Sequence, residues 1–300
     1  MGGYSARYHA ASLAAVFLAL AIGILIGIGF GDDVVSGTTE QLEESLQGDV
    51  QEARQQADDL ESELGREREF GEAVYPALVG DELSEERVAV IALGGLPGGV
   101  AKDVDDALEP AGASITQVAV VRVPPDVGAL AGDLEGTRHA RARRSPEAIE
   151  ALGRSVGRQL VLGGGVIRRV RAQLLSRFSG RLAGTDDVVI VRDAPDEFDE
   201  RDAEATARLE DGILEGIRST RLPAVGAEQT DTEESSVELF DSHDIPSVDN
   251  LDLIAGRVAM VSVLLGADGN FGIKDTADEL LPDLLRPPAG AGGPVGAGRP

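Results

Sequence analysis

The chain has no cysteine and no tryptophan, and its aromatic residues are only seven Phe and three Tyr. Without cysteine it can form no disulfide framework, thiolate zinc site, iron–sulfur cluster or cysteine nucleophile. Basic residues are also scarce, because 27 Lys and Arg stand against 53 Asp and Glu, a formal net charge of -26. We expect no nucleic-acid partner, since such binding needs positive charge and aromatic stacking surface. A hydrophobic content of 42% still allows the 300 residues to bury a core.

One long stretch near the N-terminus lacks charge altogether. Residues 10–31 carry no charged side chain, and as a helix they would span about 33 Å, enough for a bilayer core. Because this run is longer than the apolar region of a cleaved signal peptide, it predicts an uncleaved transmembrane anchor. Arg7 precedes the run, and Asp32 and Asp33 follow it. Residues 1–9 are therefore expected in the cytoplasm and the rest of the chain beyond the membrane.

Small residues recur at every fourth position of the predicted anchor and would form one stripe along the helix. Such a stripe allows two helix backbones to approach closely, although about half of the segment is Ala, Gly or Ser in any case. We expect helix association through Ala11, Ala15, Ala19, Gly23, Gly27 and Gly31.

Residues 32–73 predict a coiled-coil stalk, because apolar residues follow one another at alternating spacings of four and three. The seam is weak, since two of its positions are Ala and residues 32–72 contain 14 acidic residues and three Arg. A homodimer or higher homo-oligomer would therefore need further contacts from the membrane helix or from the domain that follows the stalk. The alternative is a single amphipathic helix that lies on the protein's own domain. The predicted seam consists of Leu46, Val50, Ala53, Ala57, Leu60 and Leu64.

Apolar runs of strand length and helical spacings alternate in residues 74–286, which predicts an extracytoplasmic α/β domain with a mainly parallel, Rossmann-like sheet. A tight turn is expected at residues 94–99. The final residues, 287–300, are mostly Pro, Gly and Ala and predict a disordered tail. The expected strands are residues 87–93, 114–123, 188–191 and 258–265, and the expected helices are residues 100–111 and 203–218.

No phosphate-binding or catalytic pattern is complete. The turn Gly94–Gly99 lies between a strand and a helix, as a phosphate-binding loop does, but it lacks the G-x-G-x-x-G spacing and a Walker lysine. His243 has Asp241, Ser242 and Asp244 beside it, yet neighbours in sequence rarely form a triad and no G-x-S-x-G elbow is present. We expect no enzyme activity and no catalytic, cofactor-binding or metal-binding residue.

Positive charge is concentrated in one block. Residues 138–181 contain 11 Arg and two acidic residues, a local charge of +9. Such a block attracts an anionic partner, which could be lipid headgroups, wall polymers or the acidic stalk, and the alternative is a solvated face that is paired internally. The predicted basic interaction patch consists of Arg138, Arg141, Arg143, Arg144, Arg168, Arg169 and Arg171.

Two distant parts of the sequence resemble one known family. Residues 7–23, RYHAASLAAVFLALAIG, are similar to the R-x-H-x-x-S-L-A-A-V-F-L-A-L-A-I-G opening of the actinobacterial MctB proteins. This likeness depends most on Arg7, His9 and Ser12, because apolar strings match one another easily. The family's C-terminal pattern is matched by Ser247–Asn250, Gly256–Arg257, the expected strand after them and Gly269–Gly272.

The resemblance implies two different functions. MctB proteins are labelled copper transporters, which implies copper homeostasis and a channel role at the outer membrane. Their corynebacterial relatives, called SteB, imply a role in daughter-cell separation, in which the protein binds a membrane or cell-division partner and regulates peptidoglycan hydrolases. The residues argue against a literal copper channel, because the chain offers one predicted membrane helix, two Met and three separated His. We expect a non-enzymatic oligomeric scaffold of the cell envelope whose link to copper is indirect.

Overall fold

The computed structural model describes residues 6–193, 195 and 198–283, with side chains left out at 6–11, 27–45 and 142–144. The chain divides into two compact units, Met1–Glu69 and Phe70–Pro300. The predicted tail, 287–300, and most of the predicted cytoplasmic segment lie outside the described residues.

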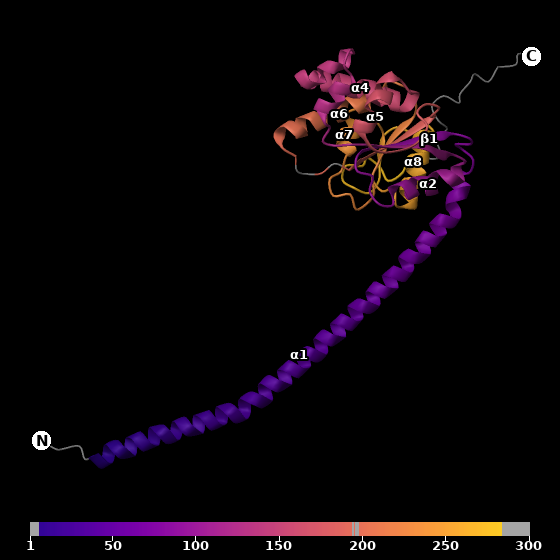
Figure 1. The fold of residues 1–300 in the computed structure, drawn as a ribbon. Coiled ribbons are helices and arrows are strands. Elements are labelled where there is room, and N and C mark those ends of the chain that lie inside the picture. The colour runs from indigo at the N-terminus through magenta and orange to yellow at the C-terminus, as the bar shows by residue number, and fades with distance from the viewer. Residues whose placement is uncertain (1–5, 194, 196–197, 284–300) are drawn as a thin grey trace, which may run out of the picture. The chain divides into compact units, whose positions relative to one another are not determined.

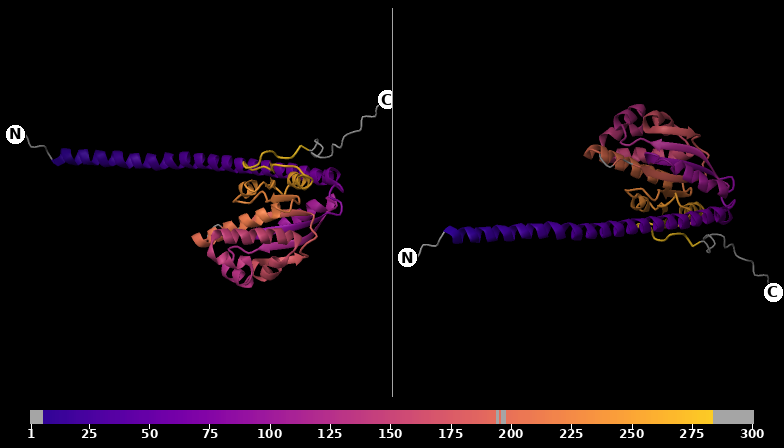
Figure 2. Two further views of the ribbon diagram at one scale, coloured as in Figure 1. Left: turned by 90° about the horizontal axis from the view of Figure 1, so that it is seen from above. Right: turned by 90° about the horizontal axis from the view of Figure 1, so that it is seen from below.

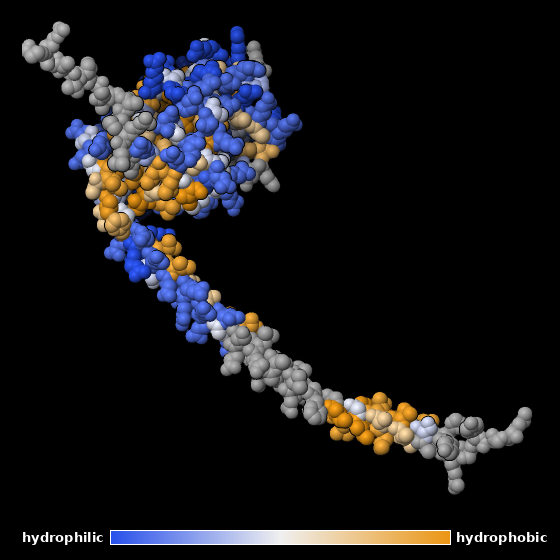
Figure 3. Space-filling model, turned by 180° about the vertical axis from the view of Figure 1, so that it is seen from behind, coloured by the Kyte–Doolittle hydropathy of each residue, from blue (hydrophilic) through white to orange (hydrophobic). Residues whose placement is uncertain are grey.

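The described residues of the first unit belong to one helix. Helix α1, Ala6–Val79, includes the whole of the predicted anchor and stalk and ends in the second unit. Figure 3 shows apolar side chains over its early described part and mainly polar ones further on. No helix long and apolar enough to cross a membrane is found where side chains are described. The predicted span 10–31 extends past the described side chains 12–26 on both sides, so the anchor stays a prediction.

The second unit contains a seven-stranded sheet in the order β3-β2-β1-β4-β5-β6-β7. All neighbouring strands are parallel except β3, which is antiparallel to β2. The predicted α/β domain with a mainly parallel sheet is confirmed. The strands are β1 Arg87–Gly94, β2 Ser114–Val121, β3 Leu175–Gly180, β4 Asp187–Asp193, β5 Ala224–Ala227, β6 Ser247–Val248 and β7 Asn270–Phe271.

Helices cover both faces of the sheet, as Figure 1 and Figure 2 show. Alternate residues of β1 point to opposite faces, so Val90 belongs to one core cluster and Ile91 to the other. The end of α1 packs with α2 and α8 on the first face, where the buried Tyr75 donates a hydrogen bond to the Ala107 carbonyl at 2.7 Å. The remaining helices are α2 Val100–Ala111, α3 Val127–Asp133, the 3₁₀ helix η1 Arg138–Arg144, α4 Pro146–Leu162, α5 Gly165–Leu174, α6 Glu200–Arg218, α7 Val237–Asp241 and α8 Ile254–Leu264.

One predicted strand is wrong. Residues 258–265 lie in and just after helix α8, whose apolar residues are buried on nearly every side. A helix that is apolar all round has no 3.6-residue pattern and cannot be distinguished from a buried strand by its sequence. Gly256 allows α8 to start close to the preceding loop, because a Cβ there would overlap the Asn250 carbonyl.

Helices α4 and α6 pack backbone to backbone on the second face. Gly153 and Gly157 of α4 face Gly212 and Gly216 of α6, and a Cβ added at any of the four would lie within 3.0 Å of a backbone carbonyl of the other helix. Both pairs have the four-residue spacing that puts small residues on one helix face. The predictions from sequence did not include this contact.

Candidate functional site

A cleft of about 750 Å³ opens at the carboxyl ends of the central strands. The chain passes from β1 to β2 on one side and returns to β4 on the other, so the strand order reverses between β1 and β4. Open parallel sheets bind ligands at this kind of switch point. The cleft is lined by Gly94, Gly95, Pro97, Gly98, Val100, Val123, Val191, Arg192, Asp193, Pro195, Glu228, Gln229, Asp231, Thr232, Glu233 and Glu234.

The glycine turn after β1 lies against the end of β4. Gly94 has a φ of 91°, and a Cβ there would overlap the Asp193 carbonyl. The Gly95 amide donates to that same carbonyl at 2.6 Å. Glycine is needed here both for the left-handed backbone and for the close approach. The predicted turn between strand and helix is therefore confirmed and forms one wall of the cleft.

The charge of the cleft does not suit a phosphate. Asp193, Asp231, Glu233 and Glu234 line it with exposed side chains, and like charges repel an anionic ligand. The first turn of α2, where a phosphate would bind, already holds the Asp103 carboxylate, which accepts a hydrogen bond from Gln229 Nε2 at 2.7 Å. The arrangement favours a cationic group instead.

An ion pair between Glu228 and Lys274 fixes the acidic wall of the cleft, which residues 228–234 form. Glu228 is 3% exposed, and Lys274 Nζ lies 2.7 Å from its Oε1. The same ammonium donates to the carbonyls of Gln229 and Thr232 at 3.2 and 3.0 Å, while the Ser236 amide donates to the other Glu228 oxygen at 2.8 Å. These bonds satisfy the buried Glu228 carboxylate and the partly exposed Lys274 ammonium, and they fix the loop that carries three of the exposed carboxylates.

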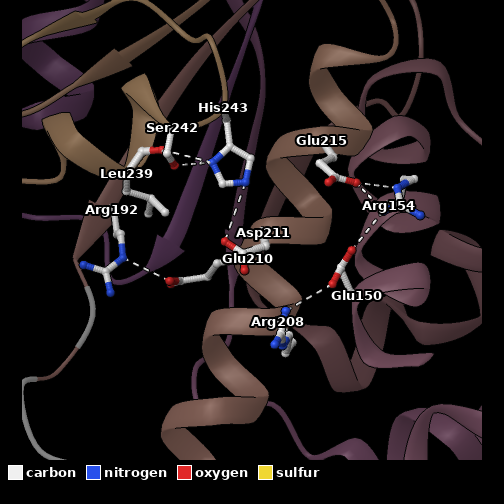
Figure 4. Close-up of polar contacts among 10 residues, drawn as sticks. All are labelled: Glu150, Arg154, Arg192, Arg208, Glu210, Asp211, Glu215, Leu239, Ser242 and His243. Atoms are coloured by element: carbon white, nitrogen blue, oxygen red, sulfur yellow. Dashed lines mark hydrogen bonds and ion pairs between the residues drawn. The ribbon is translucent and has the colours of Figure 1, made fainter. Parts of the chain in front are cut away.

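The polar cluster around His243 does not form a catalytic triad (Figure 4). Ser242 Oγ donates to the Leu239 carbonyl at 2.7 Å, so its proton is not directed at the imidazole. His243 Nδ1 lies 3.0 Å from both Ser242 Oγ and the Leu239 carbonyl, and Nε2 lies 3.6 Å from Asp211 Oδ1. The imidazole thus binds the end of α7 to α6, whereas a triad needs the histidine to accept the serine proton.

Comparison with protein families identifies the chain. The family model described as copper transport outer membrane protein, MctB, matches residues 4–282. The chain belongs to the MctB family. A search among curated proteins gave no match. At the level of its family, the chain is a copper-related envelope protein.

The C-terminal residues that resemble the MctB pattern meet in the structure. The Asp249 carboxylate accepts the amides of Ile273 and Lys274 at 2.8 and 3.0 Å, and Gly272, with φ of 149°, leaves room for it. Ser247 Oγ donates to Asn270 Oδ1 at 2.9 Å. These MctB-like residues therefore fasten β7 and the segment after it to β6. Their role in this structure is to close one edge of the sheet.

The two histidines with described side chains, His139 and His243, have their polar contacts with other residue types and not with each other. His139 is 6% exposed, and its ring nitrogen Nε2 lies 3.0 Å from Arg138 Nε and 3.1 Å from Ser155 Oγ. Burial, and then the charge of Arg138, lower the pKa of His139. Within the part of this MctB-family chain that the structure describes, no three His, Cys, Asp or Glu residues are grouped to hold a metal ion. His9 lies among the residues whose side chains are not described.

The structure separates the predicted basic patch into two groups. Arg168, Arg169 and Arg171 are exposed on α5, and the Arg171 guanidinium lies 5.2 Å from the centre of the Phe178 ring. Arg138 and Arg141 are exposed on η1. The side chains of Arg143 and Arg144 lie outside the described residues.

Ion pairing inside the basic block is limited. Among its arginines with described side chains, only Arg154 forms ion pairs, with Glu150 at 3.0 Å and with Glu215 (Figure 4). Arg154 was absent from the predicted patch, although Glu150, four residues before it on the same helix, is a sequence signal for this pairing. The remaining described guanidinium groups of the block have no carboxylate partner.

The described residues of the predicted association surfaces are exposed on α1. Ala15, Ala19 and Gly23 are exposed in α1, whereas Ala11, Gly27 and Gly31 are not among the residues with described side chains. All six seam residues are exposed: Leu46, Val50, Ala53, Ala57, Leu60 and Leu64.

Proposed function

We propose that this protein is a membrane-anchored, non-enzymatic scaffold of the cell envelope that self-associates through its stalk helix. The observation that carries this proposal is the exposure of the seam, since Leu46, Leu60 and Leu64 are 54%, 60% and 58% exposed on a mainly polar stretch of α1. Burying a leucine side chain contributes roughly 1.5–3 kcal/mol. The heptad spacing puts these leucines on one stripe, which a second copy of the helix would cover.

Two further features support the scaffold. The uncharged run 10–31, with its stripe of small residues, would anchor the chain with residues 1–9 in the cytoplasm and bring two helices together in the membrane. The carboxylates of the cleft would receive cationic side chains of an envelope or cell-division protein. Binding of such a partner is also what the SteB resemblance implies for cell separation. The outer membrane remains the alternative location that the family description names.

Self-association should depend on the seam. In the full chain, Leu60→Asp puts a charge into the contact between helices and should weaken dimers by about tenfold or more. Ser62→Asp adds the same charge two residues away on the outer side and should change association by less than about twofold. Sedimentation of the purified chain in detergent measures both. Added salt should strengthen association, because it screens the acidic stalks from each other.

Equal association of the wild-type chain and both variants would show that the seam does not hold copies together. The single helix that lies on the protein's own domain would then be the better interpretation.

Copper should not be retained tightly. The chain has no thiolate and only two thioethers, the ligands that copper(I) prefers. After incubation with copper(I) and competition with a chelator, the purified chain should keep no more metal than an unrelated acidic protein of similar charge. One copper per chain that survives the chelator would contradict the indirect link and favour transport in the literal sense of the family description.

A further inference from the structure

The sheet has one open edge in the described part of the chain. Strand β3 pairs with β2 alone, and four of its six residues, Ser176, Arg177, Ser179 and Gly180, are exposed. The opposite edge is covered, because Phe271 of β7 forms a bridge with Glu279 and the Gly272 amide donates to the Glu279 carbonyl at 2.9 Å. An unpaired strand edge offers backbone donors and acceptors to an incoming strand.

Unpaired positive charge flanks this edge. Residues 168–181 contain five Arg and no acidic residue, and none of the five forms an ion pair within the described structure. Successive strand residues point to opposite faces, so Arg177 lies on the face opposite to Phe178. Arg171 stacks on the Phe178 ring at 5.2 Å. A strand added to β3 would therefore meet guanidinium groups on both of its faces.

We propose that β3 and α5 form a docking site for an extended acidic peptide of a partner protein, which adds to the sheet as a strand beside β3. The backbone edge would supply affinity and the arginines would select acidic side chains. A second copy of β3 is disfavoured because two such edges carry the same charge. The acidic stalk of a second copy is helical and offers no strand edge. This site is independent of the stalk seam, so either proposal can fail without the other.

The probe is a synthetic peptide of alternating Glu and Val, added to the purified full chain in detergent at low salt. We expect binding by fluorescence anisotropy, together with slower hydrogen exchange of β3 backbone amides that are not bonded to β2. A peptide of alternating Glu and Pro has the same charge but cannot pair as a strand, and it should bind at least about tenfold more weakly. Raising the salt should weaken binding of the Glu and Val peptide.

Matched variants test the arginines. Arg177→Glu with Arg181→Glu should weaken binding of the Glu and Val peptide by about tenfold or more. The control, Arg201→Glu with Arg221→Glu, makes the same change of charge at exposed positions outside this surface and should leave the affinity within about twofold of the wild-type value. Arg177→Gln with Arg181→Gln tests the loss without adding repulsion and should fall between them.

Two results would overturn the proposal. One is absence of binding by the Glu and Val peptide. The other is that the Glu and Pro peptide, inorganic polyphosphate or anionic lipid vesicles bind as well as the Glu and Val peptide, while hydrogen exchange of the β3 amides does not change. The second result would show a general polyanion surface and no strand addition.

Discussion

Gly157→Ala should destabilise the α/β domain by about 3 kcal/mol or more, although alanine is normally the better helix residue by about 1 kcal/mol. The added Cβ would overlap the Ile213 carbonyl of α6, and its next neighbours are also Ile213 backbone atoms. Backbone cannot rotate away as a flexible side chain can, so the two helices must separate and lose contacts on the second face of the sheet. Hydrogen exchange of the buried β1 and β4 amides measures the loss.

Gly132→Ala is the matched control for this change. Gly132 lies in α3, and nothing is within 4 Å of the position that its Cβ would take. Its variant should be neutral or slightly more stable. If the Gly157→Ala variant were as stable as the Gly132→Ala variant, the backbones of α4 and α6 would not be in close contact at Gly157.

The ends of several helices and strands were predicted closely, because residues next to them in the sequence determine where they begin and end. Helix α2 has the expected bounds Val100–Ala111, because Gly99 precedes it and Gly112, with φ of 84°, ends it. Strand β1 is one residue longer than expected, and α6 begins three residues earlier at Glu200, after its Asp199 cap. Strand β2 ends at Val121, two residues before the expected end.

Features that depend on strand order could not be predicted in the same way. The turn at 94–99 was expected, but its partner in the cleft, Asp193, is almost one hundred residues away and reaches it only because β4 pairs with β1. The wall at 228–234 depends in turn on β5 lying beside β4. Spacing within a sequence does not specify which strands become neighbours.

The middle of the chain was the least predictable part. Residues 128–184 form most of α3, all of η1, α4, α5 and β3, and the family model matches them although no quoted motif did. Their arginine content drew attention to charge and away from the glycines 153 and 157, whose role appears only when α6 is in place. The open edge at β3 likewise follows from topology, because antiparallel pairing with β2 leaves its other side free.

At the amino end of β4, far along the strand from the cleft, one buried carboxyl group makes stability depend on pH. Asp187 is 3% exposed, and its Oδ2 is buried without a hydrogen-bond partner. Burial, and then the nearby charges of Glu86 and Asp186, raise the pKa of Asp187 to about 7. The neighbouring Asp186 differs, because its hydrogen bonds with Arg87 at 2.8 and 2.9 Å lower the pKa of that carboxyl group.

Asp187→Asn should therefore stabilise the domain at pH 8 by an amount that disappears near pH 4. The raised pKa means that folding favours the neutral acid, so the cost of Asp187 is absent below its ordinary pKa of about 3.9, grows as the pH rises towards 7 and is constant above that. A shift of this size corresponds to at most about 4 kcal/mol. Asp105→Asn removes the same charge from an exposed site on α2 and serves as the control for net charge. Denaturation of the three proteins between pH 4 and pH 8 gives the comparison, and an Asp187→Asn curve parallel to that of the wild-type chain would show that Asp187 is solvated as an ordinary carboxylate.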